Sequence, residues 1–375
     1  MFAWLRDWLG GLGSERGHGE SGLDAEPVGV SDKAGAARRV QSRAASRTFR
    51  LAAWSGLELP DAPPPDAGDD AQVAALVPLV KAHFAAQRPD PASFPALATR
   101  VIDLVEKPDV DVNKLVNMIS QDSAISAKVL NVANSVAYRR SAEVQDLRAA
   151  VTLLGLREVA NIAVGVAGRS LFDMEARAEF EVFARHWNRL YHQSMTTAFA
   201  SGWLAIERRA RSDHAFLAGM FHDIGKSIAL RSLSSLVVNG KLSARCSDRV
   251  AERVIDEVHV ELGVQMHSAW KMPRFLTFVC QHHHAPRAEA RPEYVVLHVV
   301  RVASGLNLLR WGHVEDLDVQ IKRSIAALGL GERQVRTLGA QILDYADRVA
   351  TMFNIPVDAD GPAQKAKEQL FVAPR

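Results

Sequence analysis

A His-Asp pair, His222 and Asp223, is the part of this sequence most suited to chemistry. It places an imidazole beside a carboxylate, and divalent metals that hydrolyse phosphate esters bind such mixed donor sets. Further histidines frame the pair: His192 lies 30 residues before His222, and the run 282–284 begins 59 residues after Asp223. The pattern indicates a metal site, although a His and an Asp that only fix a helix turn would give the same pair.

The composition limits the class of protein. The chain has 375 residues, enough to bury a sizeable core, and its net charge of +2 argues neither for nor against a nucleic-acid partner. Only two cysteines occur, Cys246 and Cys280, so no disulfide framework is expected. No apolar run approaches the roughly 20 residues that span a bilayer. Residues 1–13 lack the basic start of a signal peptide. We therefore expect a cytoplasmic protein.

The first 70 residues differ from the rest of the chain. Residues 14–30 are rich in Gly, Ser and Glu, and residues 62–70 are mostly Pro, Ala, Gly and Asp. Such segments bury too little apolar surface to offset their ordering entropy, so residues 14–70 are predicted to be largely disordered. A short amphipathic start, residues 1–13, and a basic stretch, residues 33–50, suggest weak contact with a membrane surface or an acidic partner. A frayed start and a solvated basic linker remain the alternative.

From residue 71 to 355 the sequence predicts one mainly helical unit, followed by a C-terminal tail, residues 356–375. Apolar residues recur at helical spacing and alternating strand-like runs are nearly absent, so an all-α fold is expected. Asp122 is a plausible N-cap. The predicted helical stretches are 73–84, 98–105, 115–119, 123–133, 149–154, 157–171, 176–208, 248–270, 274–284, 293–311 and 333–353.

Five motifs in order resemble those of HDOD domains, over roughly residues 90–310. HDOD domains are similar to the HD and HD-GYP phosphohydrolases but have usually lost hydrolytic residues. The resemblance implies a two-lobed, all-α bacterial signalling module. The first lobe would run to about Arg169, the second from His192 to Ser304, and the C-terminal helix would pack on them. The motifs are Ile119–Tyr138, Ala149–Ala160, Ala215–Lys226, His259–Gly263, and Trp270–Pro273 followed by His283 and His284.

The same resemblance implies a ligand set. An HD-type hydrolase needs a first His, which would be His192, then the His222-Asp223 pair and a later Asp, while Lys226 fits a phosphate-facing Lys. Three further histidines resemble those of two-metal HD-GYP sites. The expected convergent set, with a divalent metal as candidate cofactor, is His192, His222, Asp223, His259, His283 and His284.

Two departures from the hydrolase pattern concern the enzyme reading. The sequence reads Val302-Ala303-Ser304 where related hydrolases place an Asp after Val-Ala, and serine is a poor metal ligand beside a carboxylate. The Gly-Tyr-Pro motif is also missing. These departures favour a non-catalytic regulatory scaffold that acts through a protein partner or a small ligand, with weak or no metal binding. A metal-dependent phosphohydrolase acting on a nucleotide, perhaps a cyclic one, is the alternative. Nucleic-acid binding has no recognisable fold behind it.

Overall fold

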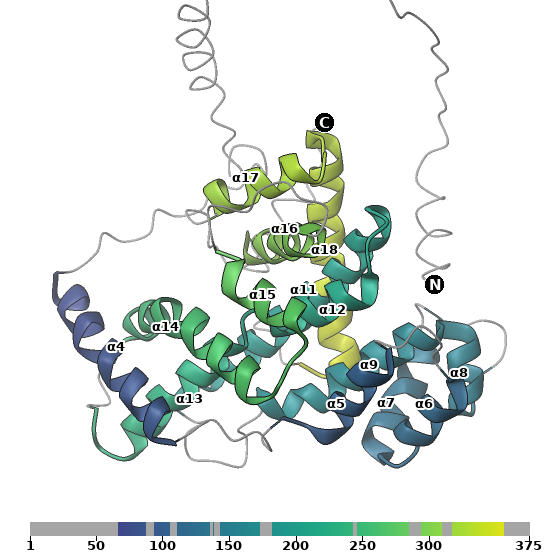
Figure 1. Cartoon of the computed structure of the whole chain (residues 1–375), viewed down its shortest axis with the longest axis horizontal. Coiled ribbons are helices and arrows are strands. Elements are labelled where there is room, and N and C mark those ends of the chain that lie inside the picture. The colour runs from purple at the N-terminus through teal and green to yellow at the C-terminus, as the bar shows by residue number, and fades with distance from the viewer. Residues whose placement is uncertain are drawn as a thin grey trace, which may run out of the picture.

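The computed structural model describes residues 67–87, 94–105, 111–135, 138, 143–172, 182–242, 246–284, 294–309 and 317–355. All regular secondary structure in these ranges is helical, and they contain no strand (Figure 1). The predicted all-α fold is therefore confirmed. The amphipathic start, the basic stretch and the C-terminal tail lie outside the described residues, so the predictions made for them stay predictions.

The helices lie close to the predicted ranges, and the predicted ends of α7, α14 and α18 are correct to within one residue. In chain order they are α4 (Ala67–Gln87), α5 (Ala96–Val105), α6 (Val112–Ile119), α7 (Ser123–Ala133), α8 (Leu147–Leu154), α9 (Leu156–Gly168), the 3-10 turn η2 (Arg169–Leu171), α11 (Ala184–Glu207), α12 (Ser212–Phe221), α13 (Ile224–Val238), α14 (Asp248–Ala269), α15 (Arg274–His282), α16 (Val295–Leu309), α17 (Leu317–Ala327) and α18 (Glu332–Phe353).

The first lobe consists of α5 to α9, which pack on one another (Figure 1). Asp122 caps α7 as predicted: its Oδ1 accepts hydrogen bonds from the backbone N–H groups of Ala124 and Ile125, both at 3.0 Å. At the other end of α7, the Asn134 side chain bonds both backbone groups of Val144 at 2.8 Å. These bonds satisfy polar groups that a helix end leaves without intrahelical partners. They fix the ends of the helix within the lobe.

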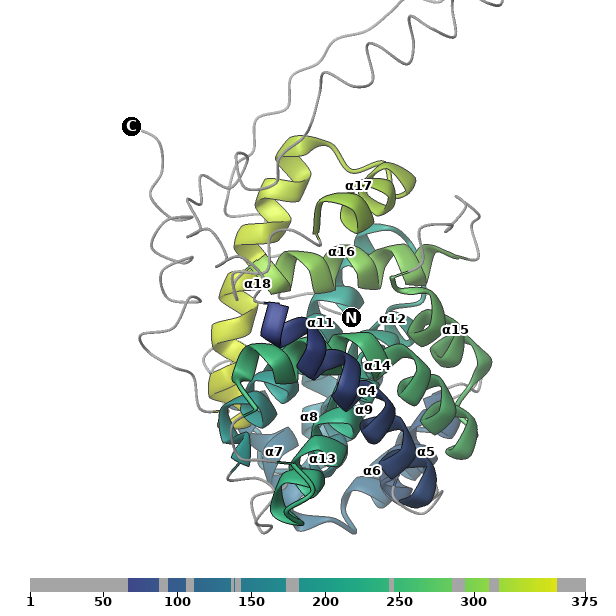
Figure 2. The ribbon, with the colours of Figure 1, turned by 90° about the vertical axis from the view of Figure 1, so that its left-hand side faces the viewer.

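The second lobe is built around α11, which packs against α12, α16 and α18. Helices α13 and α14 pack against each other beside it, and α4 lies across both (Figure 2). The first described helix thus belongs to the second lobe and not to the first, contrary to the expected division. The predicted tail boundary is also wrong at its end, because α4 begins at Ala67. Asp69 and Asp70 form ion pairs with α14, to Arg249 at 3.4 Å and to Arg253 at 2.6 Å.

The C-terminal helix α18 joins the two lobes. It packs on α11 and α16 in the second lobe and also contacts α7 in the first (Figure 1). Its buried end carries Phe353, whose ring lies 6.1 Å from that of Phe199, while the Phe353 carbonyl accepts a hydrogen bond from Arg169 at 3.2 Å. The prediction that this amphipathic helix packs on the helical unit is confirmed.

Within the described residues, no single helix is both long and apolar enough to cross a membrane. The bent pair of α8 with the segment Leu156–Leu171, whose parts meet at 114°, passes this test only when the two parts are taken together.

Glu158 gives the fold a predicted pH dependence. Its side chain is 6% exposed, and burial raises its pKa to about 7, although a hydrogen bond from Tyr138 at 3.2 Å opposes the shift. The folded state then favours the protonated acid, so its stabilising effect is complete below pH 4.5 and is lost as the pH rises towards 7. We expect Glu158→Gln to raise the free energy of unfolding at pH 8 by about 1–3 kcal/mol and to change it little at low pH.

Urea unfolding at several pH values measures this difference. Glu143→Gln is the matched control, because Glu143 is exposed and should show no comparable change. Parallel pH profiles for Glu158→Gln and the wild-type protein would contradict the assignment.

Candidate metal centre

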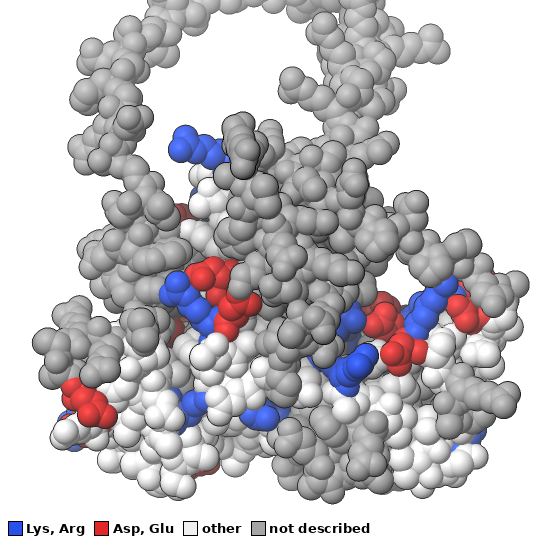
Figure 3. Space-filling model, turned by 180° about the vertical axis from the view of Figure 1, so that it is seen from behind, with Lys and Arg blue, Asp and Glu red and all other residues white. Residues whose placement is uncertain are grey.

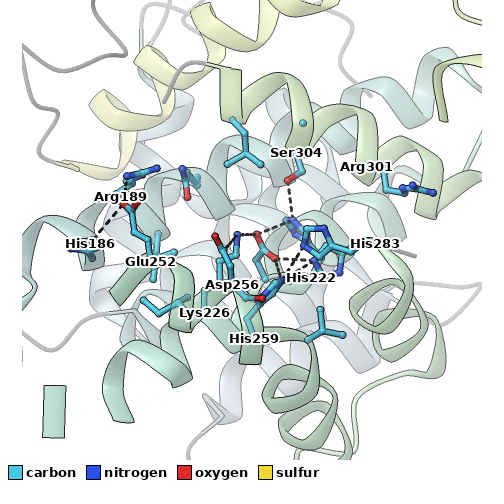
Figure 4. A pocket seen from close by; sticks show the side chains of 18 of the residues that line it. His186, Arg189, His222, Lys226, Glu252, Asp256, His259, His283, Arg301 and Ser304 are labelled. Carbon is cyan, nitrogen blue, oxygen red and sulfur yellow. Dashed lines mark hydrogen bonds and ion pairs between the residues drawn. The ribbon is translucent and has the colours of Figure 1, made fainter. Parts of the chain in front are cut away.

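Four side chains from three neighbouring segments converge at the junction of α13, α14 and α15 (Figure 4). Asp223 precedes the first residue of α13, His259 lies within α14, and His283 and His284 follow the last residue of α15. One donor atom from each lies within 4.8 Å of the others. We call these four residues the His/Asp cluster.

The donor separations in the His/Asp cluster match those of a tetrahedral metal site. The His259 Nε2 atom lies 3.1 Å from His284 Nε2 and 3.4 Å from His283 Nε2. The Asp223 Oδ1 atom lies 3.0 Å from His283 Nε2 and 3.5 Å from His259 Nε2. Metal–nitrogen bonds of about 2.0–2.1 Å at tetrahedral angles place ligand atoms roughly 3.3 Å apart. The cluster can therefore hold one metal ion, and three imidazoles with a carboxylate suit zinc or a similar divalent transition metal.

Backbone hydrogen bonds orient the imidazole rings for this role. His259 Nδ1 lies 2.7 Å from the Asp256 carbonyl, and His283 Nδ1 lies 2.7 Å from the Cys280 carbonyl. A carbonyl accepts but cannot donate, so each Nδ1 carries the proton and each Nε2 presents a lone pair to the cluster. Two lone pairs 3.4 Å apart repel each other unless a cation lies between them. The ring orientation thus favours a bound metal.

A close helix contact brings Asp223 and His259 together. Gly225 in α13 lies against the backbone of α14, and a Cβ atom there would be 1.8 Å from the His259 carbonyl oxygen. Gly263, one turn further along α14, completes the contact, because a Cβ at Gly225 would also be 2.8 Å from its nitrogen. Glycine at position 225 therefore lets the two ligand-bearing helices approach closely.

Asp223 contributes a carboxylate that the fold does not use as a helix cap. It stands at the N-cap of α13, yet its side chain makes no capping hydrogen bond. Its Oδ1 faces the cluster, while Oδ2 lies 3.1 Å from Lys226 Nζ. Burial by itself would raise the pKa of Asp223, but Lys226 and His222 hold it well below its usual range. The carboxylate is therefore ionised at neutral pH, and a purely structural turn does not account for it.

The histidines remain neutral, as metal binding requires. Burial lowers the pKa of His259 to about 4, with a further lowering from Lys226. Burial and the neighbouring His283 lower the pKa of His284 to about 2. These imidazoles do not need to lose a proton before binding a cation near pH 7.

His222 lies beside the His/Asp cluster rather than in it. Its Nδ1 lies 2.9 Å from the Gly219 carbonyl, and its Nε2 lies 3.1 Å from Ser304 Oγ and 3.5 Å from Asp223 Oδ2. The hydroxyl of Ser304 thus occupies the place where the resemblance expects a carboxylate. A site on this side has only His222 and one oxygen of Asp223 as metal-binding groups, too few to hold an ion firmly.

The prediction that His192 shares the cavity is wrong. Its Nε2 lies 2.8 Å from the Ala346 carbonyl in α18, and His192 is not among the residues that line the cavity. Successive residues of a helix point about 100° apart, and the residues of α11 that face the cavity are Arg189, Leu190 and Gln193. His192 is therefore a buried core histidine, and the first ligand expected of an HD-type hydrolase is missing from this site.

A cavity of about 360 Å³ lies next to the cluster (Figure 4). Lys226 lines it, but its ammonium lies 3.1 Å from Asp223 and 3.5 Å from Asp256, so both neighbouring carboxylates hold it in place. Sequence reasoning missed three polar residues of the lining, Arg189, Gln193 and Arg301. Only the helical spacing of Arg301 to Ser304, three residues apart on α16, pointed towards the site.

Solved structures with the same fold come from other bacteria. An HDOD domain protein of unknown function from Geobacter sulfurreducens has a TM-score of 0.54 at 20% identity, covering 75% of this chain and 99% of its own. A protein from Shewanella amazonensis SB2B, provisionally described as a metal-dependent phosphohydrolase, has a TM-score of 0.53 at 22% identity, covering 77% and 100%. A provisionally described signal transduction protein from Marinobacter aquaeolei VT8 has a TM-score of 0.51 at 19% identity, covering 85% and 66%.

A curated but uncharacterised protein of Treponema pallidum (strain Nichols) is 26% identical over 258 residues, which cover 65% of this chain and 48% of that protein. The chain thus spans about half the length of this relative. The family model of the HDOD domain matches residues 92–286, more than half of the chain and all four members of the His/Asp cluster. This protein therefore belongs to the HDOD domain family.

Proposed function

We propose that the protein is a regulatory HDOD protein whose His/Asp cluster binds one divalent metal ion, best matched by zinc, in a site that does not hydrolyse phosphate esters. The observation that carries the proposal is the convergence of four protein donors within 4.8 Å of one another. Structural zinc sites use four protein ligands, whereas catalytic ones keep a position open for water. A fully ligated ion here has no open position at which to activate a water molecule.

The consequence of binding lies in the elements that the ion connects. Asp223, His259 and the pair His283-His284 belong to three different segments, and a shared ion fixes α13, α14 and α15 relative to one another. Metal binding to a folded site adds its free energy to folding. Loss or gain of the ion then changes the rigidity of the surface formed by these helices, which is a means of signalling to a protein partner.

A protein is proposed as the partner in preference to a nucleic acid. On the face shown in Figure 3, the described Lys and Arg side chains alternate with Asp and Glu, and they form no continuous cationic area. Proteins that bind a nucleic-acid backbone usually present such an area. Mixed charge on this face suits a protein contact better.

A metal-dependent phosphohydrolase is the second candidate, and the name of the Shewanella neighbour and the presence of Lys226 in the cavity favour it. Turnover separates the two functions. We expect zinc-loaded and manganese-loaded protein to hydrolyse neither bis(p-nitrophenyl) phosphate nor cyclic dinucleotides above the rate of a metal-loaded buffer.

Two variants make this assay sharper. Ser304→Asp restores the expected carboxylate beside His222, but with His192 turned away we expect it to add no turnover. His284→Ala removes one cluster ligand and creates the open position that a catalytic ion requires. Turnover by the wild-type protein that Asp223→Ala abolishes would overturn the non-catalytic function.

A further inference from the structure

Arg301 is a buried cation without a partner. It lies on α16 and is 4% exposed, and none of its three guanidinium nitrogens has a hydrogen-bond partner. A buried charge that is neither paired nor hydrogen-bonded is unfavourable, so proteins rarely retain one without a use for it. Arg301 therefore points to a group that binds there.

Arg301 faces the cavity beside the His/Asp cluster. It lies on one side of α16 with Ser304, Gly305 and Leu308, and all four line the cavity. Figure 4 shows Arg301 near His283, with Arg189 and Glu252 on the other side of the site. Cavities of about 300–1,000 Å³ hold small organic ligands, and this one is about 360 Å³. The lining combines these polar groups with the aliphatic side chains of Leu190, Ile255, Val260 and Ile321.

The other cations of the lining already have acidic partners. Arg189 is paired with Glu252 at 2.9 Å, and Lys226 with Asp223 at 3.1 Å. The buried Nε2 of Gln193, which also lines the cavity, resembles Arg301 in having no hydrogen-bond partner. The unsatisfied groups of Arg301 and Gln193 are donors, so they select a ligand rich in acceptors.

We propose that Arg301 anchors a binding site for a small organic phosphate, with the phosphate group on the guanidinium and the apolar part against the aliphatic lining. The planar guanidinium donates two parallel hydrogen bonds to phosphate oxygens. A dianionic phosphate is favoured over a carboxylate because Arg323 adds a second positive charge nearby. Burial, followed by the charge of Arg323, lowers the pKa of Arg301. The site goes beyond the proposed metal function and does not require the ion.

Calorimetric titration of the full chain with phenylphosphonate, which cannot be hydrolysed, tests the site, with inorganic phosphate and benzoate as comparisons. We expect saturable binding of phenylphosphonate, weaker binding of inorganic phosphate and the weakest binding of benzoate. Arg301→Gln should raise the Kd for phenylphosphonate by about 10-fold or more, because it removes hydrogen bonds to a charged group. The thermal midpoint of the ligand-free variant should stay unchanged or rise, since an unpaired buried charge is lost. A structural role for Arg301 predicts a lower midpoint.

Arg323→Gln is the matched control, because Arg323 is exposed and does not line the cavity, and we expect less than about a threefold change in Kd for this variant. Should Arg301→Gln fail to fold, Arg301→Lys keeps the charge but loses the fork, and its Kd should still rise severalfold. Absence of phenylphosphonate binding, an unchanged Kd in the Arg301 variants or tighter binding of benzoate would overturn the proposal.

Titration after treatment with a chelator separates this site from the metal function. Phenylphosphonate binding that depends on Arg301 and survives metal removal supports the site, whether or not the His/Asp cluster binds an ion. If removal of the metal abolishes binding while Arg301→Gln leaves it intact, the ligand binds the ion itself. The anion site is then wrong and the metal centre stands.

Discussion

Gly225→Ala is expected to destabilise the protein by more than about 4 kcal/mol, an effect seen when a side chain is forced into a packed backbone contact. The new methyl group would lie 1.8 Å from the His259 carbonyl oxygen and 2.8 Å from the Gly263 nitrogen. Both atoms belong to the backbone of α14, so no side-chain rotation relieves the clash. Helices α13 and α14 must move apart, and Asp223 moves away from His259 as they do.

Thermal and urea unfolding of the purified variant, or its failure to accumulate as a folded protein, measures this effect. Gly339→Ala in α18 is the control, because a Cβ there meets no atom within 4 Å. That variant should be as stable as the wild-type protein or more stable by up to about 1 kcal/mol, since alanine favours a helix. Equal stability of the two variants would contradict the close contact of α13 and α14.

Removal of the metal is the second change with a large expected effect. A ligand that binds only the folded state stabilises it by about 4 kcal/mol when its free concentration is 1,000 times its Kd. We therefore expect a strong chelator to lower the thermal midpoint of the wild-type protein by several degrees, and added zinc to restore it. Asp223, His259 and His283 lie on segments that separate when the fold opens, so the unfolded chain does not preserve the site.

Two neighbouring histidines provide the matched variants for this experiment. His283→Gln removes a cluster ligand, whereas His282→Gln changes a histidine that packs beside Phe278 at a ring distance of 4.7 Å. The His283 variant should lose the response to chelator and zinc, and the His282 variant should keep it. The same response in both variants would place the metal elsewhere on the chain.

The sequence predicted most of the fold and most of the metal cluster. Asp122 marked the start of α7, because a side-chain oxygen at an N-cap satisfies exposed backbone N–H groups locally. The His-Asp pair and the later histidines belong to short motifs, so their convergence followed from the order of those motifs. Local patterns gave no sign that α4 packs on α13 and α14, because that contact joins segments far apart in the chain.

The errors at the site have a common physical origin. Helix α11 is buried almost continuously from Ser194 to Ala205, so it has no polar stripe that shows which residues face the cavity. His192 was therefore assigned to the cavity that Gln193 faces. Arg301 lies in the apolar run of α16, where a single charge resembles an exposed position in an amphipathic helix. Only the packing of α16 shows that this cation is buried.

Metal content of the full chain tests the central claim most directly. The protein is purified without chelator or a histidine tag, equilibrated with zinc, desalted and analysed by mass spectrometry of the elements. We predict about one zinc ion per wild-type chain, as for other sites with four protein ligands, and a large loss in His259→Gln and His283→Gln but not in His282→Gln. Wild-type protein that retains no metal, or retains as much as the two cluster variants, would contradict the account.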